Sequence, residues 1–160
     1  MQPDDAAHVV RLLGRDREAV MRMAAMPWPV VEAEARKWIA GRSGKAANAF
    51  AVLDRESGEF LGSAGFSLGR EEQGTEGVAE VGYWIGRPYW GRGCASQAVG
   101  MLLGLARRVG AVQAAGLVFP GNAASERVLE KNGFSRIGEE IGDFPLRGGK
   151  RTVIRWERVL

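Results

Sequence analysis

The spacing of apolar and polar residues predicts helices in the first quarter of the chain. Asp4 or Asp5 is a suitable N-cap for a helix that runs to about Leu13, with apolar residues on one face. The helical pattern continues over residues 15–26 and ends before two prolines that flank a tryptophan. A second amphipathic helix is expected over residues 31–40, before a glycine.

After residue 40 the apolar period changes from that of a helix to that of a strand. Residues 43–47 and 69–77 are polar or glycine-bearing and are expected to be loops, and a third polar, glycine-rich loop is expected between the last two strands. The first two strands are separated by a polar turn, which predicts a hairpin. The expected strands are Phe50 to Leu53, Phe60 to Leu68, Val78 to Ile85, Val112 to Phe119, Phe134 to Gly138 and Arg151 to Val159.

Two further helices are expected between the later strands. The first runs from about Ala95 to Val109 and carries an apolar stripe that should pack on a sheet. The second begins at Asn122, a good N-cap, and ends at Asn132 with Gly133 in the C′ position. Helices, a meander and then alternating strands and helices predict an α/β or α+β mixed sheet covered by helices on both faces.

Composition narrows the class of protein. With 160 residues, 46% apolar and 26% charged, the chain should form one domain, residues 1–160. A net charge of +3 from scattered basic residues does not favour nucleic-acid binding. One cysteine and one histidine argue against a disulfide framework and a metal site. Without a long apolar run or a signal peptide, no membrane association and a cytoplasmic location are expected.

The turn from Trp90 to Ala95 carries the most specific chemical signal. It joins an expected strand to an expected helix and contains two glycines. From Val81 to Ser125 there is no Asp or Glu, whereas there are four arginines, two of which, Arg87 and Arg92, lie near the turn. The exposed amides and the dipole at a helix N-terminus favour an anion, so this turn predicts an anion-binding site.

Two nucleotide-binding motifs do not fit this turn. A dinucleotide-binding turn has a third glycine where this chain has Ser96, and it needs an acid on the next strand, which has none here. A nucleoside-triphosphate loop needs a Lys-Ser or Lys-Thr pair after its second glycine, and that pair is missing after Gly93.

Together with the Asn-x-x-Ser…Glu-Lys-x-Gly-Phe motif from Asn122 to Phe134, the turn resembles the GCN5-related N-acetyltransferases (GNAT). The similarity is greatest to the branch that acetylates the N-termini of ribosomal proteins. The resemblance implies a mostly antiparallel sheet of about six or seven strands with one parallel pair splayed apart, and about four flanking helices. Relatives usually have a strand before the first helix, and here that strand is expected to be missing or reduced to Met1 to Pro3.

The resemblance also implies an acetyl-CoA site, with acetyl-CoA as a co-substrate and no metal. Amides of the turn would bind the pyrophosphate, Arg92 or Arg87 would add charge, and the strand before the turn would bond the pantetheine through its main chain. Trp90 stands where the family usually has Gln or Arg. The residues expected to bind the cofactor are Tyr83, Trp84, Ile85, Trp90, Gly91, Arg92, Gly93, Cys94, Ala95, Ser96, Asn122, Ser125 and Lys131.

Catalytic roles follow from the same resemblance. Glu80 occupies the position of a candidate base acting through water, and its alternative is a solvated or ion-paired carboxylate. Many relatives have a tyrosine as acid seven residues after the asparagine, where this chain has Leu129. Ser125 is therefore the expected proton donor for the thiolate, and its alternative is a cap of the helix's first turn.

The acceptor of the acyl group is less defined. The expected partner is an amine-bearing substrate, either a peptide N-terminus or a small molecule, and the protein is expected to be a monomer or homodimer. Three aromatic residues are candidates for the acceptor pocket or for the core: Trp28, Trp38 and Tyr89. Glu32 and Glu34 are weaker candidates for binding a cationic amine. A CoA-binding regulator without turnover is the main alternative, and a nucleic-acid module rests only on the pI of about 9.4.

Overall fold

The computed structural model describes residues 1–44, 47–69 and 74–160. Its strands form one seven-stranded sheet in the order β1-β2-β3-β4-β5-β7-β6. Only β4 and β5 are parallel, and every other neighbouring pair is antiparallel. The strands are β1 (Ser43–Gly44), β2 (Ala47–Leu53), β3 (Phe60–Leu68), β4 (Val78–Ile85), β5 (Gln113–Val118), β6 (Ser135–Phe144) and β7 (Gly149–Val159).

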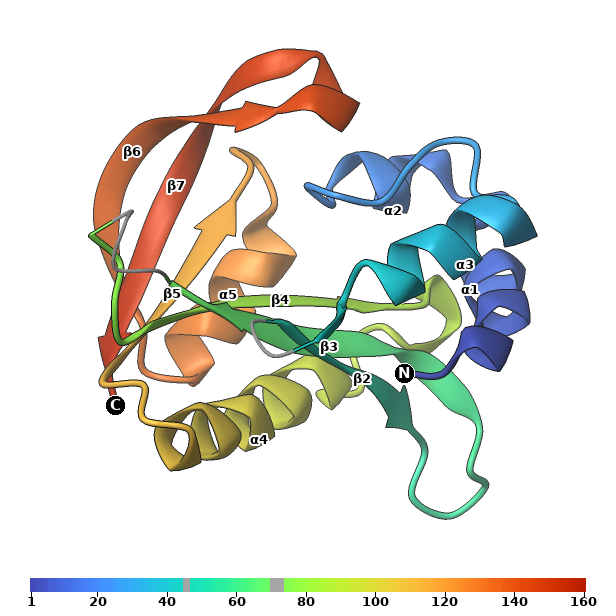
Figure 1. Ribbon diagram of the computed structural model, residues 1–160, viewed down its shortest axis with the longest axis horizontal. Helices are drawn as coiled ribbons and strands as arrows, with labels where there is room; N and C mark the ends of the chain where they lie inside the picture. Colours follow the sequence, from blue (N-terminus) through green and yellow to red (C-terminus); the bar gives the residue numbers. More distant parts are fainter. Residues whose placement is uncertain (45–46, 70–73) are drawn as a thin grey trace.

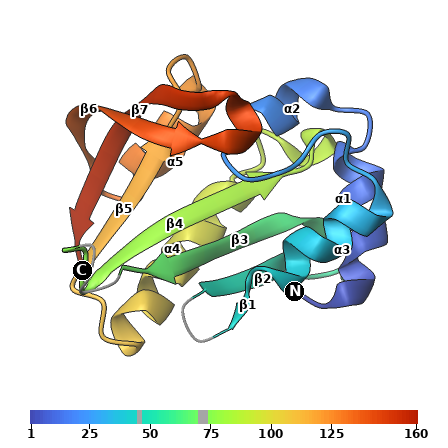
Figure 2. The ribbon, with the colours of Figure 1, turned by 45° about the horizontal axis from the view of Figure 1, so that its top comes forward.

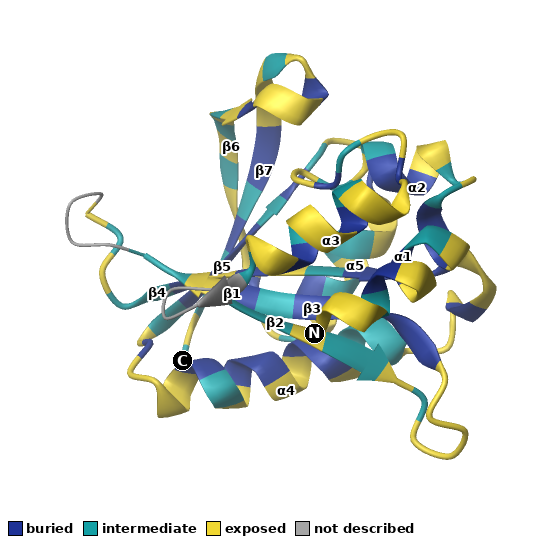
Figure 3. Cartoon of the chain, turned by 45° about the vertical axis from the view of Figure 1, so that its right-hand side comes forward, coloured by how far each residue is buried: buried dark blue, intermediate teal, exposed yellow. Residues whose placement is uncertain are grey.

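Helices cover both faces of the sheet (Figure 1). On one face lies α4, whose buried residues contact the sheet while its opposite side is exposed (Figure 3). The N-terminal helices pack on the other face, over one end of β3 and β4. The helices are α1 (Ala6–Leu13), α2 (Arg17–Met21), α3 (Glu32–Ala40), α4 (Cys94–Arg108) and α5 (Ala123–Lys131).

Local sequence signals placed most of these elements correctly. The expected strands at Phe60–Leu68 and Val78–Ile85 have the observed bounds. Asn122 caps α5, because its side chain accepts a hydrogen bond from the amide of Ser125, and Gly133 follows the helix with a φ of 74°. The helical pattern over residues 15–26 gives only the short α2, which begins where Asp16 accepts from the Ala19 amide.

Two expected loops are wrong in part. Residues 43–47 were expected to be a loop, but β1 lies at Ser43–Gly44 and β2 begins at Ala47. Residues 45–46 of this loop, and residues 70–73 of the loop expected over 69–77, fall outside the described residues. The polar loop expected after Gly138 is instead the long β6–β7 hairpin. Its β6 strand lies at the sheet edge, where exposed residues alternate with half-buried ones and only Phe144 is buried, so its polar residues are compatible with a strand.

No strand precedes α1 among the described residues. The chain begins with a short 3₁₀ turn, Pro3–Asp5, followed directly by α1. The terminal amine of Met1 donates to the carbonyl oxygen of Ala49 in β2, at 2.7 Å. This contact anchors the start of the chain beside the sheet.

The parallel strands β4 and β5 separate after a short paired stretch. Their pairing covers Val78–Glu80 with Gln113–Ala115, and beyond it each strand pairs only with its outer neighbour. The two strands therefore diverge as a V, which is visible in Figure 1. Leu129 of α5 is buried where they part, so close to Gly116 of β5 that an added Cβ at this glycine would lie 3.1 Å from it.

A buried arginine connects the β6–β7 hairpin to the N-terminal helices. Arg147, at the hairpin tip, donates to the carbonyl oxygens of Val20 and Met26, both at 2.7 Å. It is 8% exposed, and its burial lowers its pKa. These bonds hold the hairpin and the segment after α2 together across the parted strands, as the proximity of the two in Figure 2 shows.

Candidate functional site

Two adjoining cavities lie where β4 and β5 part. The first, here called the loop cavity, has a volume of about 380 Å³ and lies against the turn before α4. The second, the sheet cavity, has a volume of about 280 Å³ and lies over the sheet between α3 and the β6–β7 hairpin. Both are lined by Tyr83, Trp84, Asn122 and Ser125, so the two cavities meet at these residues.

The loop cavity brings together nearly all the residues expected to bind a cofactor. The exception is Arg92, which does not line it. The expected residues that do line it are Tyr83, Trp84, Ile85, Trp90, Gly91, Gly93, Cys94, Ala95, Ser96, Asn122, Ser125 and Lys131.

The turn into α4 presents free amides to the loop cavity. Gly91 and Gly93 have φ angles of 75° and 79°, which favour glycine. Nothing lies within 4 Å of a Cβ built at Gly91, so its backbone conformation, and not crowding, is what requires glycine there. The first amide with a helical partner is that of Gln97, which bonds the carbonyl of Gly93. The preceding amides, from Cys94 to Ser96, are the ones that a helix leaves for an anion.

The loop cavity is lined by cations and by no acid among the described residues. Lys131 and Arg127 lie one helical turn apart on α5, and Arg22, the residue after α2, lines the cavity as well. Sequence reasoning identified Lys131 and missed the other two. The spacing of Arg127 four residues before Lys131 would have indicated it, because such residues share a helix face. Arg22 was not recognisable, because it reaches the cavity only through tertiary packing.

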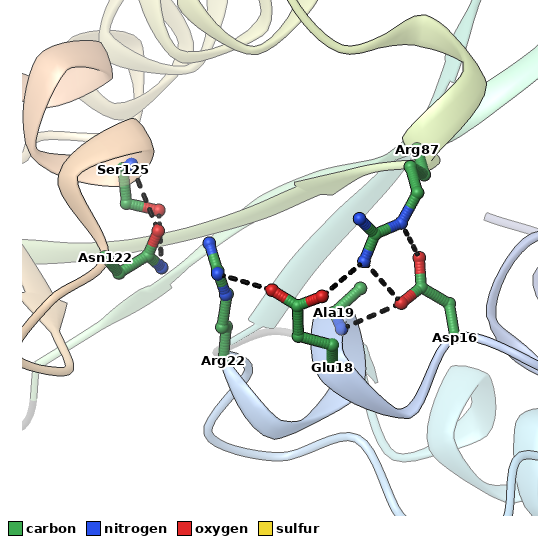
Figure 4. Close-up of polar contacts among 7 residues, drawn as sticks. All are labelled: Asp16, Glu18, Ala19, Arg22, Arg87, Asn122 and Ser125. Carbon is green, nitrogen blue, oxygen red and sulfur yellow. Dashed lines mark hydrogen bonds and ion pairs between the residues drawn. The ribbon is translucent and has the colours of Figure 1, made fainter.

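Two arginines near the turn are directed elsewhere. Arg87 donates to Asp16 at 2.7 Å and to Glu18 at 3.0 Å, and Glu18 also bonds Arg22 at 2.6 Å (Figure 4). The hydrogen bond from Arg87 is the main cause that lowers the pKa of Asp16. Arg92 lies with its guanidinium carbon 5.8 Å from the centre of the Tyr89 ring. The charge of Arg87 is therefore already compensated within the protein.

One edge of β4 is free of strand partners beyond Glu80. The amide of Gly86 donates to the carbonyl of a β3 residue, Leu61, and the carbonyl of Val78 accepts from the residue just after β3. Even-numbered residues of β4 therefore direct their backbone groups toward β3. Tyr83 and Ile85 therefore direct theirs toward the gap, and the backbone of Trp84 points away from it. The carbonyl of Ile85 accepts from the indole of Trp90 at 2.6 Å. The main-chain binding expected of this strand is thus restricted to Tyr83 and Ile85.

Asn122 and Ser125 are held together at the junction of the cavities. The Asn122 amide donates to the Ser125 hydroxyl at 3.1 Å, which leaves the hydroxyl proton free to be donated (Figure 4). The Tyr83 hydroxyl donates to the carbonyl oxygen of Ser125 at 3.1 Å and so bridges β4 and α5. Burial raises the pKa of Tyr83, which keeps it protonated as a donor. Leu129, the residue in place of a tyrosine, is buried and supplies no hydroxyl.

Glu80 lies in the sheet cavity and not in the loop cavity. Its side chain is accessible to water along the cavity, yet the cavity walls partly dehydrate it, and this dehydration raises its pKa. Arg155 opposes the shift and Glu140 adds to it. A carboxylate with a raised pKa near the junction is suited to accept a proton.

The residues expected on the acceptor side differ in whether they line a cavity. Trp38 lines the sheet cavity, Tyr89 lines the loop cavity, and Trp28 lines neither. Glu32 pairs with Arg36 and Glu34 with Lys37, and none of these four lines either cavity.

The described residues contain neither a candidate metal site nor a candidate membrane-spanning helix. No three His, Cys, Asp or Glu side chains come together in a group that could hold a metal ion in the described part of the chain. None of its described helices is long and apolar enough to cross a membrane.

The sequence matches the acetyltransferase (GNAT) domain over residues 1–135, so this chain belongs to the GNAT acetyltransferase family. It is 31% identical over 140 residues to the uncharacterized protein YkkB of Bacillus subtilis, a match that covers 83% of this chain and 77% of YkkB. It is also 42% identical over 57 residues to the uncharacterized N-acetyltransferase p20 of Bacillus licheniformis, which covers 36% of this chain and 30% of p20.

Solved structures share the fold at low identity. A GNAT-family acetyltransferase from Bacillus anthracis has a TM-score of 0.82 at 19% identity, covering 99% of this chain and 91% of that one. RimL, a ribosomal L7/L12 α-N-protein acetyltransferase in complex with coenzyme A, has a TM-score of 0.81 at 20% identity, covering 100% and 91%. The mixed sheet with one parallel pair is therefore the GNAT fold.

The raised pKa of Glu80 predicts how its substitution affects stability. The unfolded chain releases the Glu80 proton at a lower pH than the folded protein, so between the two pKa values the folded protein binds more protons and its stability falls as the pH rises. We expect Glu80→Gln to increase the free energy of unfolding at about pH 7.5 and to have a smaller effect at about pH 4. Urea unfolding at both pH values measures this.

The exposed Glu76 provides the control, since Glu76→Gln removes the same charge outside both cavities. A loss of stability in Glu80→Gln at the higher pH, with Glu76→Gln unchanged, would show that the Glu80 carboxylate is stabilised rather than dehydrated by its surroundings.

Proposed function

We propose that this protein transfers an acetyl group from acetyl-CoA directly to a primary amine, either a peptide N-terminus or a small-molecule amine. The observation that carries the proposal is the loop cavity, in which free helix amides, cations and a free strand edge come together without an acid among the described residues. Coenzyme A presents phosphates and an amide-bearing arm, which are the chemical groups that such a lining binds.

The residues that would hold acetyl-CoA follow from their positions. The amides from Cys94 to Ser96 would bind the pyrophosphate, and Arg127 and Lys131 would add charge-assisted hydrogen bonds. The free backbone groups of Tyr83 and the free amide of Ile85 would pair with the arm as a further strand would. The acetyl thioester would then lie near the junction, next to Asn122 and Ser125.

Acetyl-CoA supplies an activated acyl group, and the chain's own residues would position the amine and manage two protons. The amine nitrogen forms a bond to the acyl carbon as the carbon–sulfur bond breaks, so the amine loses a proton and the sulfur gains one. Glu80 would accept the first proton through a water, and the Ser125 hydroxyl would donate the second. Holding the amine and the thioester together in a closed site contributes further to the rate.

The relatives support this proposal. RimL is described as a protein N-terminal acetyltransferase with coenzyme A bound, and p20 as an N-acetyltransferase.

A CoA-binding regulator without turnover has the same loop cavity, and it is distinguished by the absence of thiol release with any amine.

Binding of acetyl-CoA tests the cofactor half of the proposal. We expect saturating acetyl-CoA to raise the melting temperature, because a ligand that binds only the folded state stabilises it. The double variant Arg127→Gln/Lys131→Gln should weaken acetyl-CoA binding by about tenfold, since two cations near the phosphates are lost at exposed positions. Isothermal titration calorimetry measures the change.

Arg108→Gln, on the exposed end of α4, is the control and should bind acetyl-CoA as the parent does. If the parent protein does not bind acetyl-CoA, or if the double variant binds it as tightly as the parent, the loop cavity is not the cofactor site.

Turnover tests the proton donor. We expect Ser125→Ala to lower kcat for thiol release by about 10²-fold or more, which is the usual contribution of a positioned acid, while acetyl-CoA binding stays close to that of the parent. Release of free CoA thiol, measured across a panel of amines, gives kcat. An unchanged kcat in Ser125→Ala would assign Ser125 the role of a helix cap only.

A further inference from the structure

The sheet cavity is lined by an arginine that has no carboxylate partner among the described residues. Arg42 follows the end of α3 and lines this cavity. Its guanidinium carbon lies 4.6 Å from the centre of the Trp38 ring, a cation–π contact that fixes its position. Its side chain is half-buried, and no carboxylate of the described residues pairs with it.

The other arginine that lines the sheet cavity, and the buried arginine of the nearby β6–β7 hairpin, already have partners. Arg22 is bonded to Glu18, and Arg147 is bonded to three backbone carbonyls. Dehydrating a cation without a partner costs free energy, and burial is the cause that lowers the pKa of Arg42. A guanidinium of this kind gains most from a ligand that brings a carboxylate, because the pair can form two parallel hydrogen bonds.

The floor of the sheet cavity leaves room between Arg42 and the junction. Arg42 precedes Ser43, whose partner in β2 is Asn48, so it lies beside the row Ala49, Gly65 and Gly82, which crosses β2, β3 and β4. All three residues of this row are small. A Cβ added to Gly82 would meet no atom within 4 Å. Because β3 lies between β2 and β4, Ala49, the residue beside Arg42, is two strand spacings, about 10 Å, from Gly82.

The acid that lines the same cavity is Glu80, two residues before Gly82 on β4 and therefore on the same face of the sheet. The cavity thus has a carboxylate near the junction and an uncompensated guanidinium at its far side. An acceptor with an amine at one end and a carboxylate at the other matches this charge arrangement.

We propose that Arg42 binds a carboxylate of the acceptor, so that the acceptor class is an amine tethered to a carboxylate. The inference rests on the proposed acetyl transfer and specifies its substrate. The same chemistry occurs in a free amino acid and in a peptide whose N-terminus is followed by an acidic side chain.

Matched acceptors test the inference and separate the two sources. Amino acids of increasing length are compared with their primary amides, and Ala-Glu peptides with Ala-Gln peptides, both amidated at the C-terminus. We expect the carboxylate member of at least one set to have a kcat/KM at least about tenfold higher, from one charge-assisted interaction. The set that shows the difference identifies whether the carboxylate belongs to a free amino acid or to a peptide side chain.

The variant Arg42→Gln should lower kcat/KM for that carboxylate acceptor by about tenfold to a hundredfold, mainly through KM, and leave its neutral counterpart unchanged. Arg42→Lys should recover part of the loss. Arg107→Gln, exposed on α4 at the other face of the sheet, is the control and should match the parent. Equal kcat/KM for acid and amide, or an equal loss for both in Arg42→Gln, would overturn the inference.

Equilibrium binding separates this inference from the proposed function. With CoA present, the carboxylate acceptor should raise the melting temperature of the parent and not that of Arg42→Gln, whereas both should bind acetyl-CoA equally. Acceptor binding through Arg42 without any thiol release would support the inference and contradict acetyl transfer. Acetyl-CoA binding and turnover with no dependence on Arg42 would support acetyl transfer and contradict the inference.

Discussion

The separation of β4 from β5 is the feature on which the rest of the site depends. The two strands pair over only three residues each, and Leu129 is buried against Gly116 where they diverge. Tyr83 spans the opening by bonding the carbonyl of Ser125. Without this separation β4 would have no free edge, and the loop and sheet cavities would not meet beside Ser125.

Around the opening, some cations are bonded to carboxylates or carbonyls of the protein, and others have no such partner among the described residues. Arg87 is held by two carboxylates of the α2 region, and Arg147 is used to fasten the β6–β7 hairpin. Lys131 and Arg127 remain available in the loop cavity, and Arg42 remains available in the sheet cavity. An unpaired cation that is partly dehydrated, as Arg42 is, costs free energy, so its position indicates where an anionic group of a ligand belongs.

The loop site was largely predictable from the sequence, and the acceptor side was not. The glycines of the turn and the cap at Asn122 act locally, so their roles follow from neighbouring residues. The separate location of Glu80 in the sheet cavity, and the place of Arg42 beside it, depend on packing between segments distant in sequence. Both strands of the β6–β7 hairpin were expected, but their full length was missed because an edge strand needs no apolar face, and the glycines suggested a loop.

Amide hydrogen exchange of β4, with and without acetyl-CoA, tests the central claim most directly. The amides of Tyr83 and Ile85 face the gap, whereas the amide of Trp84 is bonded to β3. The account predicts that saturating acetyl-CoA slows exchange at Tyr83 and Ile85 and changes Trp84 little. Unchanged exchange at Tyr83 and Ile85 under saturation would show that the cofactor does not bind along the parted strand.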